Sequence, residues 1–90
     1  MNTETWAHAR EEFAKEGLVP HVWSNEPGHV YGEHIHPYHK MLICLKGSIV
    51  FHTPDGDVTL NEGDRLDLPP DTHHSATVGE SGVTCMEAAR

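Results

Sequence analysis

Apolar residues recur at helical spacing in the first part of the chain. Within residues 3–16, Trp6, Ala9 and Phe13 follow one another at intervals of three or four, and Gly17 stands where a helix would stop. The pattern predicts one short amphipathic helix. Its apolar stripe needs a surface to cover, which either the rest of the chain or a neighbouring subunit can supply.

Beyond Leu18 the pattern changes to short segments rich in Val, Ile, Tyr and Thr, and Pro20, Pro27 and Gly28 interrupt any long helix. Residues 54–57 and 61–64 have the composition of hairpin turns. We predict strands near residues 19–23, 29–36, 40–45, 48–53, 58–60, 65–68, 74–78 and 83–87. The expected fold is therefore all-β, an antiparallel β-barrel or jelly roll over residues 18–90 with one N-terminal helix in residues 1–17.

The 90 residues are expected to form a single domain, 1–90. A domain of this size buries only about two-thirds of its unfolded surface, so we expect added stability from a bound metal, a partner subunit or both. A homodimer is the predicted assembly, with Trp6, Phe13 and Trp23 as the residues expected to support the contact.

Charge limits the range of partners. The formal net charge of −8 repels phosphate backbones and anionic lipid surfaces, so we expect neither nucleic acid nor membrane as a partner. The longest apolar run, 41–45, is far shorter than a bilayer span, and no signal segment is recognisable, which favours a cytoplasmic protein. Cys44 and Cys85 lack C-x-x-C spacing and are predicted to be small buried thiols.

Nine histidines are the unusual feature of the composition. His34 and His36 would project to the same face of a strand and could grip one ion, although exposed polar residues would show the same alternation. A third ligand must come from elsewhere in the chain. His74 is the candidate, because Pro69 and Pro70 stiffen the backbone just before its strand begins.

These two segments resemble the two sequence motifs of the cupin superfamily. In the first motif a glycine, a His-x-His pair and a second glycine fall in register, and in the second a glycine, a proline and a histidine do so: Gly28, His34, His36 and Gly47, then Gly63, Pro69 and His74. The resemblance implies a small single β-barrel. It also implies a divalent transition metal such as zinc, nickel, iron or manganese, held by His34, His36 and His74.

Lys40 stands where the family places a glutamate ligand, and Asp71 and Val78 replace a usual glycine and asparagine. A protonated lysine has no lone pair and repels a nearby cation. Three arrangements are compatible with it: a three-histidine site with Lys40 turned away, a lysine that anchors an anionic ligand beside the metal, or a pocket without metal.

Residues next to these histidines are weaker candidates for the pocket. His39 could serve as a fourth ligand if Pro37 causes a bulge, but strict alternation places it on the opposite face from His36, and His73 has the same parity problem. Tyr38 shares parity with His36 and is expected either to line the barrel mouth or to pack in the core.

Two hypotheses for the function follow. In the first, the chain is a small metalloprotein whose metal is held by three histidines. One version of this hypothesis is an enzyme that acts on a small molecule. In the second, the chain is a non-catalytic binding or sensing module without metal, which holds a small ligand through Lys40 and the barrel histidines. The sequence has no phosphate-binding loop and no nucleophile elbow.

Overall fold

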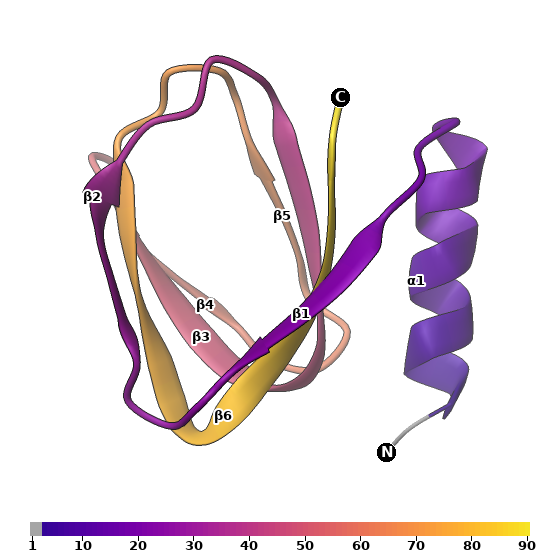
Figure 1. Ribbon diagram of the computed structural model, residues 1–90, viewed down its shortest axis with the longest axis horizontal. Coiled ribbons are helices and arrows are strands. Elements are labelled where there is room, and N and C mark those ends of the chain that lie inside the picture. The colour runs from indigo at the N-terminus through magenta and orange to yellow at the C-terminus, as the bar shows by residue number, and fades with distance from the viewer. Residues whose placement is uncertain (1–2) are drawn as a thin grey trace.

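The computed structural model describes residues 3–90 and contains one helix and six strands within them (Figure 1). All strand pairs are antiparallel, as the sequence predicts. The elements in chain order are α1 (Thr3–Lys15), β1 (His21–Asn25), β2 (Val30–His34), β3 (Lys40–Thr53), β4 (Gly56–Leu60), β5 (Arg65–Leu68) and β6 (His74–Ala89). No helix in this part of the chain combines the length and apolar character that crossing a bilayer requires.

Two long strands, β3 and β6, form the spine of the barrel and correct the predicted strand list. The predicted pairs 40–45 with 48–53, and 74–78 with 83–87, are each one continuous strand. The register of β3 against β6 shifts between Cys44 and Lys46 and again between Gly47 and Ile49. Bulges of this kind bend a strand without ending it, so the chain passes the corner with its pairing almost intact.

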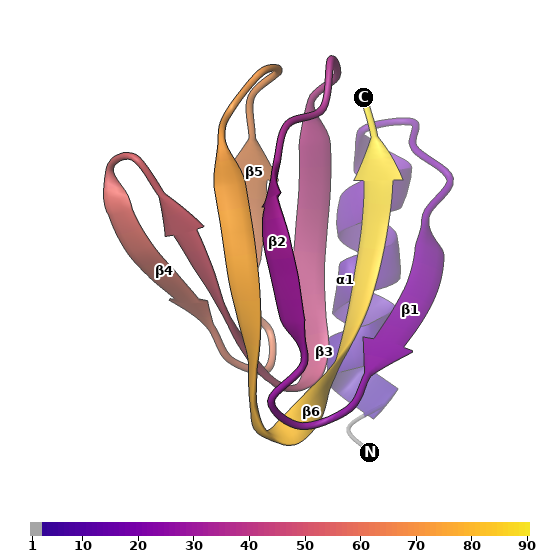
Figure 2. The same cartoon turned by 60° about the vertical axis from the view of Figure 1, so that its left-hand side comes forward.

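The remaining strands are arranged around this spine. β1 and β2 pair with β6, whereas β4 and β5 pair with β3, and the hydrogen-bonded sheet does not close into a full ring (Figure 2). β1 starts two residues later than its predicted segment, and β2 ends at His34, short of the predicted segment 29–36. Pro37 has no backbone N–H to donate to a ladder, which favours an early end of β2.

Apolar residues pack on both faces of the spine. The barrel interior holds one cluster, which includes Leu42, Cys44, Ile49, Phe51 and Cys85. The opposite face of the same sheet is covered by α1, and this second cluster contains Ala9, Phe13, Met41, Ile43, Leu45, Met86 and Ala88 (Figure 1). The barrel thus supplies the surface that the helix needs, and the prediction that Phe13 supports a dimer contact is wrong, because its side chain is fully buried within the chain.

A glycine motif ends α1, and ion pairs hold the helix segment against the barrel. Gly17 has a φ of 70°, its N–H bonds to the carbonyl of Ala14, and the N–H of Leu18 bonds to that of Phe13, which is a Schellman motif. Arg65 on β5 ties the helix segment to the barrel through ion pairs with Glu12 at 3.0 Å and Glu16 at 2.8 Å, and it also pairs with Asp67 on its own strand at 2.7 Å. The hydrogen bond from Arg65 holds the pKa of the Asp67 carboxyl below its usual value.

Candidate metal site

Three histidines converge at one end of the barrel. One ring nitrogen from each of His34, His36 and His74 can be chosen so that all three lie within 4.8 Å of one another. The ring centroids are 4.2 Å apart for His34 and His74, and 4.8 Å apart for His34 and His36. The structure therefore brings together the three residues that the motif register singles out, within reach of one ion.

Strand pairing explains two of these positions. His34 is the last residue of β2 and His74 is the first of β6, and the two are direct partners in the antiparallel ladder. His36 lies two residues beyond the end of β2, so strand alternation alone does not place it. Its ring nevertheless faces the other two, at a centroid distance of 5.4 Å from His74.

Backbone carbonyls orient two of the rings. His34 Nδ1 lies 2.7 Å from the carbonyl oxygen of Gly32, and His74 Nδ1 lies 2.9 Å from that of Thr72. A carbonyl oxygen only accepts, so each Nδ1 carries the proton and each Nε2 keeps a lone pair. Hydrogen bonds of this type fix the tautomer and direction of histidine ligands in metal sites.

The surroundings of His36 and His74 disfavour protonation of their rings. His74 is only 3% exposed, and burial lowers its pKa, with the nearby His34 and Lys40 acting in the same direction. Burial also lowers the pKa of His36, again with help from Lys40. A metal ligand has to be an unprotonated imidazole, so this environment favours metal binding over protonation near neutral pH.

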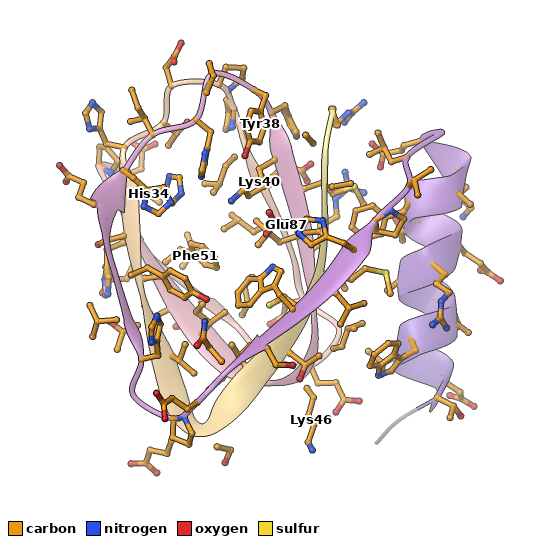
Figure 3. All side chains as sticks on the ribbon, in the orientation of Figure 1. His34, Tyr38, Lys40, Lys46, Phe51 and Glu87 are labelled. Atoms are coloured by element: carbon orange, nitrogen blue, oxygen red, sulfur yellow. The ribbon has the colours of Figure 1, made fainter. Side chains whose placement is uncertain are left out.

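Lys40 points into the barrel and has an acidic partner that sequence reasoning missed. Its Nζ lies 3.4 Å from Glu87 Oε2 and 3.2 Å from His36 Nε2, and its side chain is 13% exposed (Figure 3). Trp23 Nε1 donates to the other oxygen of Glu87 at 2.8 Å. Glu87 alternates with Val83 and Cys85 along β6, and its place on that apolar face was the signal available in the sequence.

Of the weaker candidates, Tyr38 lies beside the histidine group, whereas His39 and His73 make other contacts. The Tyr38 ring centroid is 5.0 Å from that of His36, and Tyr38 is partly exposed. His39 instead contacts Asp67 Oδ1 at 2.9 Å. His73 is exposed and lies 3.8 Å from Glu33. His39 and His73 are therefore not part of the histidine group.

The histidines open onto a cavity of about 260 Å³. Polar groups gather at one side of it, where the three histidines, Lys40 and Glu87 lie. The other lining residues are mostly apolar or aromatic: Trp23, Tyr31, Leu42, Ile49, Phe51 and Ala76, together with His21. A mainly apolar cavity with a few convergent polar groups is the usual form of a small-molecule site.

The donor set fits a transition metal. Three neutral imidazoles suit zinc, nickel or iron, and a tetrahedral ion with bonds of about 2.0–2.1 Å holds its nitrogen ligands roughly 3.4 Å apart. The nitrogens here lie within 4.8 Å of one another, so small side-chain rotations would complete the geometry. Lys40 beside His36 Nε2 is the one group of the site that opposes a cation.

Comparison with known proteins supports the architecture. A family model described as "Cupin domain" matches residues 21–86. No curated protein matches this sequence.

Solved structures share the fold. A cupin superfamily protein from Desulfitobacterium hafniense has a TM-score of 0.71 at 18% identity, covering 80% of this chain and 65% of its own. A cupin-2 domain containing protein from Shewanella frigidimarina has a TM-score of 0.69 at 17% identity, with 80% and 71% covered. The DMSP lyase DddQ from Ruegeria pomeroyi gives 0.74 at 22% identity, covering 81% of this chain and 38% of the lyase. This chain thus spans just under two-thirds of the first protein and well under half of the lyase.

Proposed function

The chain belongs to the cupin domain family, and on that basis we propose that it binds one divalent transition-metal ion through His34, His36 and His74 and acts on a small anionic molecule in its cavity. The convergence of three ring nitrogens, with two of the rings oriented by backbone carbonyls, carries this proposal. A metal held by these three histidines would keep coordination positions open, and it would supply Lewis-acid polarisation of an oxygen of the bound molecule.

Lys40 supplies the preference for an anion. Its ammonium lies between His36 and Glu87 at the polar side of the cavity, where it could donate to a carboxylate placed next to the metal. Glu87 balances the lysine charge when no ligand is bound. Trp23 holds Glu87 in place, and Phe51 and Leu42 belong to the apolar part of the cavity lining. An identity of 22% to the DMSP lyase carries the fold and not its reaction.

Metal content tests the proposal directly. Protein purified without an affinity tag, stripped with a chelator and titrated with zinc should bind close to one equivalent per chain, measured by calorimetry and elemental analysis. Binding well below one equivalent for zinc, nickel and iron(II) alike would contradict it.

A second function is favoured by a specific contact. Lys40 Nζ lies 3.2 Å from His36 Nε2, a distance at which the lysine donates to the lone pair that a metal would need. A binding module without metal, in which Lys40 and the histidines hold a small anion, uses this same contact. Absence of metal binding would therefore favour that function.

Replacing Lys40 with Glu should raise zinc affinity by about tenfold or more. The substitution removes an ammonium that competes for His36 Nε2 and adds a carboxylate that can ligate the ion. Calorimetric titration with zinc measures the change. Lys40→Met removes the charge without adding a ligand and should raise the affinity less. Equal affinities for Lys40→Glu and the parent would show that this lysine does not oppose the metal.

A further inference from the structure

The two cysteines face each other in the barrel interior. Cys44 on β3 and Cys85 on β6 are direct partners in the antiparallel ladder, and both side chains are fully buried. Both side chains belong to the apolar cluster of the barrel interior, and Cys44 Sγ lies 3.6 Å from the carbonyl oxygens of Lys46 and Gly47. They belong to neither the histidine group nor the cavity lining.

The hydrogen bonding of Cys44 defines the type of pair. Its N–H donates to the carbonyl of Asp64, and its carbonyl accepts from the N–H of Gly63, so both of its backbone groups point away from β6. Cys44 and Cys85 are therefore a non-hydrogen-bonded pair, in which the Cα atoms lie about 4.5 Å apart and the side chains approach most closely. That separation falls at the short end of the range that disulfides span, roughly 4.4–6.8 Å.

We propose that Cys44 and Cys85 form a reversible cross-strand disulfide when the protein meets a small peroxide. The sulfur of Cys44 attacks one oxygen of hydrogen peroxide, the O–O bond breaks and water leaves, which yields a sulfenic acid. The sulfur of Cys85 then attacks that of Cys44, the S–O bond breaks and a second water leaves. Two thiols and one peroxide thus give one disulfide and two waters, and the two electrons reduce the O–O bond.

Burial sets which oxidants can act. A peroxide is small enough to reach the pair through a local opening of the bulge between Cys44 and Lys46, whereas glutathione is not. The hydrogen bond from Cys85 lowers the pKa of Cys44, while the same bond and burial raise that of Cys85, so Cys44 is the first of the two to react.

A disulfide between Cys44 and Cys85 would lie close to residues that line the cavity. Glu87 is the next residue after Cys85 that faces inward along β6, and its ladder partner Leu42 lines the same cavity. The disulfide would hold the strand that carries Glu87 against the strand that carries Lys40. The proposal needs no bound metal and stands apart from the proposed function.

Mass spectrometry tests the proposal on the full chain. The reduced protein is treated with hydrogen peroxide, unfolded in iodoacetamide and digested. We expect a peptide containing Cys44 linked to one containing Cys85, no alkylation at either residue, and a rise of about 5–15 °C in the unfolding midpoint. Dithiothreitol should reverse both changes. It does not reduce oxidised Met41 or Met86, so reversal assigns the changes to the cysteines.

Single replacements provide the matched controls. Cys44→Ala and Cys85→Ala should each keep one free thiol, stay folded by circular dichroism and show no gain in midpoint after peroxide. If either variant fails to fold, the linked peptide in the wild-type protein decides the matter alone. Alkylation of both cysteines after treatment, a bond only between chains, or a sulfinic acid on Cys44 beside a free Cys85 would overturn the proposal.

Discussion

Replacing His74 with Ala is expected to lower zinc affinity by more than about 100-fold. The substitution removes one of three protein ligands, and a water molecule bound in its place does not match the affinity of an oriented imidazole. His74 is also the only one of the three that is fully buried, and its Nδ1 bonds to the carbonyl of Thr72, so its ring is well fixed. Calorimetric titration of the metal-free variant measures the loss, and circular dichroism shows whether the fold survives.

His39→Ala is the control for this experiment. His39 lies on the same stretch of chain as His36, but it contacts Asp67 instead of the histidine group. Its replacement should change zinc affinity by less than about threefold, since it removes no ligand. If His39→Ala weakens binding as much as His74→Ala, the ligand set is wrong. Unchanged binding in His74→Ala would contradict the site as a whole.

Replacing Gly47 with Ala should destabilise the protein by roughly 3 kcal/mol or more. Gly47 has a φ of 77°, and a Cβ atom there would lie 2.0 Å from the carbonyl oxygen of Gly82 and 3.2 Å from the Cα of Val83. Both are backbone atoms and cannot rotate away. The corner where β3 bends against β6 would have to open, which chemical denaturation monitored by circular dichroism measures as a lower midpoint.

Gly63→Ala separates the two causes of this loss. Gly63 has a similar φ of 88°, but nothing lies within 4 Å of the position where its Cβ would be. Its replacement carries only the conformational cost of a left-handed residue, about 1–2 kcal/mol. A loss in Gly47→Ala no larger than that in Gly63→Ala would show that β3 and β6 do not approach as closely as described.

The sequence predicts the barrel well because alternation and turn chemistry are local signals. The helix over residues 3–16, the antiparallel strands and the hairpin turn at residues 54–57 follow from short stretches of chain. The predicted hairpin at residues 61–64 is wrong, because β4 and β5 on either side of it both pair with β3 and not with each other. The strand ends do not. At Gly47 and Gly82 the residues favour a turn, yet β3 and β6 continue through bulges because pairing across the spine outweighs local preference.

The site shows the same division between local and long-range signals. The motif spacing picks out His34, His36 and His74, although the strand argument for His36 assumed that β2 extends further than it does. Glu87 was missed because its importance depends on Lys40, a residue distant in sequence. The homodimer, the metal identity and the cytoplasmic location remain predictions.

The packing of α1 against the barrel affects how the chain can fold during its synthesis. Ala9 and Phe13 share a buried cluster with residues of β3 and with Met86 and Ala88 of β6, and the β6 residues leave the ribosome after the other described elements. Until then the cluster under the helix lacks its β6 residues and the spine lacks one of its two strands. The domain should therefore fold only after β6 has emerged, and nascent chains that stall earlier should be targets for chaperones.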